Sequence, residues 1–195
     1  MLVEKTYYNA DKTAKLEVGY MEDGFVANPR EEYNIAEFTT REHRNYNLPK
    51  EFGFDWDAYD EWDMKEIEKM DKKYHIFFLD CYEHGWMKWS LAWKGMQCMF
   101  DTANRVWLMR VNKNEVENRD KALEIVEEEL DRYNKWLNGE IYGYQFERLV
   151  KWTSEDWREK TEWEYVDGCN GFYEIEEAIE DAKSLGICED IVYEN

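Results

Sequence analysis

The clearest pattern of apolar and polar positions lies in the second half of the chain. Apolar residues recur every three or four positions over 115–137, which predicts a long amphipathic helix. Asn114 is the expected N-cap of this helix, with Glu117 in the capping-box position, and Asn138-Gly139 is the expected end. A second, shorter helical pattern covers 175–185. Both predicted helices have one apolar face that must pack against another element.

Other segments alternate with a period of two or form short apolar runs, and both patterns are typical of β-strands. The strands predicted in this way cover 16–20, 73–82, 87–93, 96–100, 106–111, 141–152 and 163–166. Short gaps separate the four predicted strands between 73 and 111, so we expect them to form an antiparallel meander. Residues 55–70 have a helical period instead, with an apolar face and an acidic face.

These elements predict an α+β fold, in which acidic amphipathic helices pack on a central antiparallel sheet. The chain contains neither an internal repeat nor a linker that would divide it. We therefore expect a single domain over 1–195. Residues 1–50 are expected to be its less regular N-terminal arm, because the segment 28–50 has little periodicity and contains both prolines.

Charge is the most unusual feature of the composition. The chain has 45 acidic and 25 basic residues, a formal net charge of −20. A net charge of about 2–8 suffices for the solubility of a small domain, and a larger one destabilises the fold by self-repulsion. Direct binding to nucleic acid or to an anionic membrane is disfavoured. General acidity without a role and adaptation to high salt are the alternatives, and abundant lysines and large aromatics argue against the second.

Signatures of catalysis are absent from the sequence. It contains no glycine-rich phosphate-binding loop, no H-E-x-x-H and no G-x-S-x-G. We therefore predict neither catalytic residues nor a cofactor nor a bound metal. One alternative stays open: Cys81 and His84 form a C-x-x-H pair that Cys98 and Cys169 would have to complete as a zinc site. The many neighbouring carboxylates single out no calcium loop and no pair of catalytic acids.

The sequence also indicates a compartment. The four cysteines follow no apolar leader segment, and no apolar run approaches the length of a membrane-spanning helix. Free thiols in a reducing environment are then the ordinary expectation. We therefore expect a cytoplasmic protein that does not bind membranes.

The acids are concentrated in segments that are predicted to be helical. On a helix, side chains at i and i+4 lie roughly 5–6 Å apart, a spacing comparable with that of successive phosphates, and like charges so placed weaken the helix. A selected negative surface would explain this cost. We predict that the following residues bind a partner: Asp55, Asp57, Asp60, Glu61, Asp63, Glu66, Glu124, Glu127, Glu128 and Asp131. Trp56, Tyr59 and Trp62 are either anchors on partner arginines or core residues of the same helix.

Three segments carry a resemblance to a known group of proteins. The chain resembles uncharacterised acidic accessory proteins of phages and mobile elements of Gram-positive bacteria in the segments Asn138–Tyr144, Asp167–Tyr173 and Leu79–Gly85. The resemblance covers about residues 75–175. It implies an anti-defence context, of the anti-CRISPR or anti-restriction type, and brings no catalytic residue with it. We read the glycines of Asp167–Tyr173 as a tight connection from a strand to a helix.

Charge and context together predict an inhibitor of a host nucleic-acid-binding defence enzyme, such as a CRISPR effector or a restriction enzyme. Its acidic surface would mimic nucleic acid or block the basic groove of the enzyme. The alternatives are a metal-binding or small-molecule accessory protein that uses the Cys81/His84 region, and a structural phage protein. The oligomeric state is left open, with a dimer as one option.

Overall fold

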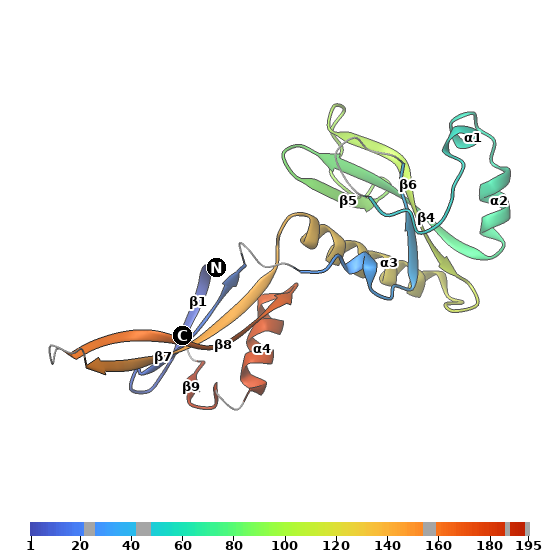
Figure 1. The fold of residues 1–195 in the computed structure, drawn as a ribbon. Coiled ribbons are helices and arrows are strands. Elements are labelled where there is room, and N and C mark those ends of the chain that lie inside the picture. The colour runs from blue at the N-terminus through green and yellow to red at the C-terminus, as the bar shows by residue number, and fades with distance from the viewer. Residues whose placement is uncertain (22–25, 42–47, 154–158, 186–187, 194–195) are drawn as a thin grey trace. The chain divides into compact units, whose positions relative to one another are not determined.

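The computed structural model describes residues 1–21, 26–41, 48–153, 159–185 and 188–193. It contains helices and two antiparallel sheets, which confirms the α+β class. The chain divides into two compact units (Figure 1). Unit 1 comprises Met1–Ala27 and Gly139–Asn195, and unit 2 comprises Asn28–Asn138. This division differs from the predicted single domain with one central sheet, because each unit has a sheet and a hydrophobic core of its own.

Unit 1 is built on a five-stranded sheet in the order β8-β7-β2-β1-β9. The strands are β1 (Leu2–Asn9), β2 (Ala14–Tyr20), β7 (Tyr142–Thr153), β8 (Glu159–Phe172) and β9 (Ile191–Val192). Leu16 and Val18 are fully buried on β2, the central strand of this order, where they pack with Tyr144 and Phe146. Residues 1–20 are thus a hairpin within the sheet, and the predicted irregular arm over 1–50 is wrong for this part.

The remaining element of unit 1 is the helix α4 (Ile175–Ser184), which buries Ala178, Ile179 and Ala182 in the core of the unit. The helical pattern predicted this element well. The segment Asp167–Tyr173 is different, because strand β8 continues through it as far as Phe172. It is therefore not the predicted connection from a strand to a helix, and Cys169 within it is exposed.

Unit 2 contains a four-stranded sheet in the order β3-β6-β4-β5. Its strands are β3 (Ala36–Thr39), β4 (Tyr74–Glu83), β5 (Met87–Leu91) and β6 (Thr102–Asn112), and the short 3-10 helix η1 (Pro29–Glu31) precedes them. The predicted meander is wrong in one respect: β6 pairs with β4 and not with β5. Residues 96–100 form turns and irregular structure where a strand was predicted, and this longer connection lets the chain cross to the far side of β4.

Three helices cover the two faces of this sheet. The long helix α3 (Arg119–Leu137) packs Val126 and Leu130 against a core that includes Phe77. The short helices α1 (Trp56–Asp60) and α2 (Lys65–Asp71) belong to a second cluster, which includes Ile76 and Leu108. Because neighbouring residues of a strand point to opposite faces, α3 and the α1–α2 pair lie on opposite sides of the sheet.

Helix α3 begins later than its pattern predicted. The side chain of Asn118, and not of Asn114, accepts hydrogen bonds from the backbone N–H groups of Asp120 and Lys121. The predicted capping box with Glu117 is therefore wrong. At the other end the prediction is confirmed, because Gly139 has a φ of +69°, in the left-handed region that glycine tolerates.

Asn134 of α3 and Asn138, the C-cap of this helix, close the outer edge of the sheet at β5. The side-chain amide of Asn134 accepts a hydrogen bond from Trp89 N at 2.8 Å and donates one to Trp89 O at 2.7 Å. Asn138, one turn later, makes the same pair of contacts with Met87 N and O, at 3.3 and 2.8 Å. The two amides thus replace the backbone groups of a fifth strand and protect this edge from other chains.

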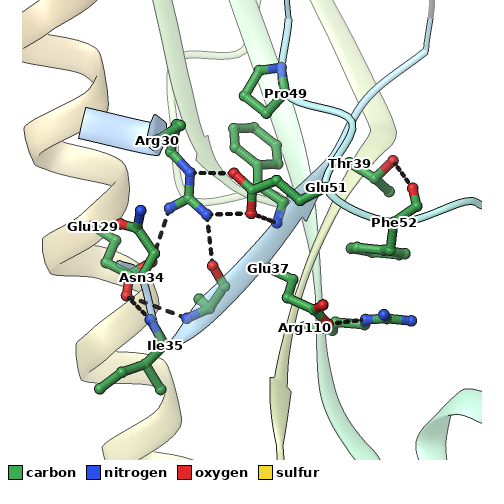
Figure 2. A network of polar contacts seen from close by, with 12 residues as sticks. Arg30, Asn34, Ile35, Glu37, Thr39, Pro49, Glu51, Phe52, Arg110 and Glu129 are labelled. Atoms are coloured by element: carbon green, nitrogen blue, oxygen red, sulfur yellow. Dashed lines mark hydrogen bonds and ion pairs between the residues drawn. The ribbon is translucent and has the colours of Figure 1, made fainter. Parts of the chain in front are cut away.

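A buried ion network joins η1, β3 and α3 (Figure 2). The guanidinium of Arg30 donates to both carboxylate oxygens of Glu51, to Oε2 of Glu129 at 2.9 Å and to the carbonyl oxygen of Ala36 at 2.6 Å. Burial by itself lowers the pKa of Arg30, but hydrogen bonds and charge from the two glutamates outweigh it and raise the pKa. Glu129 therefore points inward from the acidic run of α3 and belongs to the interior of unit 2.

Candidate functional site

All ten acids predicted to bind a partner lie in unit 2. The structure separates them into two groups on opposite sides of the four-stranded sheet. The first group lies on α1, α2 and the turn between them, which contains the exposed Trp62, and we call it the Trp62 face: Asp55, Asp57, Asp60, Glu61, Trp62, Asp63 and Glu66. The second group we call the α3 face: Glu124, Glu127, Glu128 and Asp131. One flat groove of a partner cannot contact both faces at once.

Local hydrogen bonds shape the Trp62 face. Asp55 is the N-cap of α1, where its side chain accepts from Ala58 N at 2.9 Å. Its own backbone N–H donates to Oε2 of Glu66 at 3.0 Å, which ties the start of α1 to α2. Asp57 on α1 and Glu61, the C-cap of this helix, are both exposed. Hydrogen bonds between residues that are near in the sequence therefore position these carboxylates, and apolar packing beneath each of them is not needed.

Trp62 is the unusual residue of this face. The N–H of Trp62 donates to Tyr59 O and the N–H of Asp63 to Ala58 O, the two hydrogen bonds of a Schellman motif. Trp62 occupies the position where such motifs usually have glycine, with a φ of +62°. A left-handed conformation costs an L-residue about 1–2 kcal/mol. The side chain is 86% exposed, so packing within unit 2 offsets little of this cost.

The other two aromatic candidates of this segment have structural roles. Trp56 and Tyr59 are partly buried and pack against Phe54. Tyr59 also stacks on Phe78 of β4, with a distance of 5.5 Å between ring centroids. Of the three aromatic residues that the sequence left undecided, Trp62 is thus the one available to a partner.

Two carboxylates of the Trp62 face are partly neutralised. Asp60 accepts two hydrogen bonds from Arg41, at 2.6 and 2.8 Å, and these bonds lower the pKa of its carboxyl group. Asp63 accepts from the backbone N–H and the ammonium group of Lys65, which lowers its pKa as well. Both acids stay charged at neutral pH, but the positive charge of the paired side chain partly cancels the negative charge that each presents to a partner.

The α3 face is less uniform than the sequence indicated. Glu124 and Glu128 are exposed on the outer side of the helix. Glu127 makes an ion pair with Lys94 at 3.0 Å, and Asp131 makes one with Lys135 at 2.8 Å. Two of its four carboxylates are therefore paired with lysines. An exposed aromatic residue, Trp93, lies near this face, next to Lys94 in the sequence.

The sequence prediction did not place any site residue in the more acidic unit. Unit 1 has 21 acidic and 8 basic residues, whereas the larger unit 2 has 24 acidic and 17 basic residues. Exposed acids of unit 1 lie along the edge strand β8 and on α4: Glu159, Glu162, Glu164, Asp167, Glu176, Glu177 and Glu180. Acids along a sheet edge also hinder pairing with other chains, so part of this charge has a structural explanation.

The region of Cys81 and His84 does not have the geometry of a metal site. Cys81 is 3% exposed and lies in the core beneath α3, and burial raises the pKa of its thiol to about 12. His84 is exposed, with Nδ1 at 3.4 Å from a carboxylate oxygen of Asp101. No group of three or more ligating side chains occurs in the part of the chain that the structure describes.

Comparisons with family models, with curated proteins and with solved structures gave no match to this chain. The resemblance to acidic phage proteins therefore stays a prediction. Within the described residues, none of the helices combines the length and the apolar character needed to cross a membrane.

Proposed function

We propose that the protein acts by binding and not by catalysis, and that its Trp62 face occupies a basic groove of a nucleic-acid-binding protein. In the context that the resemblance implies, the target is a CRISPR effector or a restriction enzyme in the cytoplasm of the bacterium. Bound in this way, the protein would exclude the nucleic acid of the enzyme and inhibit it.

The observation that carries the proposal is the conformation and exposure of Trp62. A tryptophan in a left-handed position is unfavourable for the fold, and its exposed ring gives little stability in return. Tryptophan, like tyrosine and arginine, is enriched among the residues that dominate binding energy at protein interfaces. Its ring also offers a face to arginine or lysine side chains of the partner.

The surrounding carboxylates supply the complementary part of the interface. Asp57, Glu61 and Asp63 flank the ring in the sequence and are exposed. Their field would attract a groove rich in lysine and arginine and accelerate association. Binding of this kind is expected to weaken steeply with salt, because screening acts most strongly on exposed charges.

Affinity capture with matched variants tests the proposal. Wild type, Trp62→Gly, the double variant Asp57→Asn/Glu61→Gln and the control Glu124→Gln/Glu128→Gln would be immobilised and exposed to lysate of a bacterium with CRISPR and restriction systems. The control removes two charges from the α3 face, on the other side of the sheet. We expect one nucleic-acid enzyme on wild type and control, and its loss from both variants of the Trp62 face. Equal retention by all four proteins would remove this face from the interface.

A further inference from the structure

A groove of about 460 Å³ lies in unit 2, next to the α3 face, where its lining residue Lys94 pairs with Glu127. The open flank of β4 beyond the end of β5, the connection after β5 and the first turn of α3 provide its lining. Six of its lining residues carry aromatic or cationic side chains: Phe77, Phe78, Trp93, Lys94, Arg105 and Arg119. The volume is within the range of small-molecule sites, and the apolar and aromatic lining with a few charged groups is typical of them.

The charge of this groove is opposite to that of the protein. Three cationic side chains line it and no carboxylate does, although acids outnumber bases by 45 to 25 in the chain. Lys94 makes an ion pair with Glu127. Arg105 and Arg119 make no ion pair with any acid in the described part of the chain, whereas Arg30 binds two glutamates.

The guanidinium groups of the two arginines each lie over an aromatic ring. The guanidinium carbon of Arg105 lies 5.1 Å from the ring centroid of Phe78, and that of Arg119 lies 4.7 Å from that of Phe77. Arg119 also donates one hydrogen bond to Ile76 O at 3.1 Å. No carboxylate of the described residues takes the remaining N–H groups of either side chain, and a guanidinium binds phosphate or carboxylate through two parallel hydrogen bonds.

A buried carboxylate fixes the rim of the groove. Asp80, which is 1% exposed, accepts hydrogen bonds from the backbone N–H of Trp93 at 2.6 Å and of Arg105 at 2.8 Å. Both of these residues have positive φ, +68° and +54°. Arg105 lies where the pairing of β4 and β6 shifts register, and such irregularities redirect side chains beside functional sites. The fold thus holds an aromatic ring and a cation at the groove in two unfavourable backbone conformations.

We propose that this groove binds a small anion that carries an aromatic ring, with the anion on Arg105 and Arg119 and the ring against Trp93. Nucleotides and aromatic carboxylates share this chemistry. The site is separate from the Trp62 face, so either proposal can fail without the other.

Isothermal titration calorimetry on the full chain tests the site with AMP, adenosine, inorganic phosphate and benzoate. We expect saturable binding of AMP or benzoate, with adenosine and phosphate at least about ten-fold weaker because each lacks one half of the recognised chemistry. AMP without benzoate would identify nucleotides as the source, and benzoate without AMP would identify carboxylates. If neither saturates at millimolar concentrations, the proposal is wrong.

Three variants assign the binding to the groove. Arg105→Asn and Trp93→Asn remove the cation and the ring, and asparagine tolerates positive φ, so both are expected to fold. We expect each to weaken the bound probe about ten-fold. Lys160→Gln, which removes a cation from unit 1, is the control and should leave the affinity unchanged. Equal affinity of Arg105→Asn and Trp93→Asn with wild type would overturn the assignment.

Discussion

The network around Arg30 permits a prediction of stability with a matched control. Replacing Arg30 by methionine keeps much of the side-chain volume but removes four hydrogen bonds and the partner charge of two glutamates. The side chain of Arg30 is 3% exposed, that of Glu129 10% and that of Glu51 26%, so water replaces little of what is lost. Removing one partner of a buried ion network costs about 3–5 kcal/mol.

The control is Arg41→Met, which breaks a bidentate pair at the surface. The side chain of Asp60 is 55% exposed, and water and salt screen such an exposed pair, so it contributes little to stability. Urea unfolding of wild type and both variants, followed by tryptophan fluorescence and circular dichroism, measures the two free energies. We expect Arg30→Met to lower the free energy of unfolding of unit 2 several times more than Arg41→Met. A loss below about 1 kcal/mol for Arg30→Met would refute the role of this network.

Three further predictions concern single contacts. Burial raises the pKa of Cys81 to about 12, so iodoacetamide at pH 8 should modify the exposed Cys169 and spare Cys81. Mass spectrometry of the folded protein measures this, and fast labelling of Cys81 would contradict its burial. Hydrogen bonds from Arg41 lower the pKa of Asp60 from 3.8, so this pair should stabilise the fold above that pH and lose its effect as the pH falls below it. In Arg41→Gln, an NMR titration should find the Asp60 pKa raised toward 3.8, and no change would refute the pairing. Asn134→Ala leaves the buried N–H and C=O of Trp89 without partners and should lower the free energy of unfolding by roughly 2–5 kcal/mol, and a loss within measurement error would contradict the closed edge.

The sequence predicted those elements whose apolar period is long and regular. The helices α3 and α4 and the strands β4 and β7 lie close to their predicted ranges. In each of them the side chains that pack in the core also dominate the pattern, so local sequence and tertiary packing agree.

The division into two units could not be predicted, because it depends on pairing between distant segments. Strand β2 pairs with β7 more than 120 residues later, and no local pattern records that contact. The same holds for the crossing of β6 to the far side of β4. The composition also shows no linker between the units. The chain passes directly from one unit to the other, at Ala27–Asn28 and at Asn138–Gly139.

The candidate sites show the same limit. Helical spacing identified exposed acids. It did not predict that Glu129 points inward to Arg30, or that the sheet separates the two acidic groups. Trp62 was among the aromatic residues that the sequence singled out, yet its left-handed conformation follows from the end of α1 and not from a recognisable signal such as glycine. The cationic groove combines Trp93, Arg105 and Arg119, which only the fold brings together.

Competition between the captured partner's nucleic acid and this protein tests the central proposal most directly. The partner would be titrated with labelled wild-type protein in the absence and presence of its own DNA or RNA. If the Trp62 face occupies the nucleic-acid groove, the apparent Kd must rise in proportion to the nucleic acid added, and Trp62→Gly must bind at least about ten-fold more weakly without it. An affinity that nucleic acid leaves unchanged would contradict occupation of the groove and place the contact elsewhere on the partner.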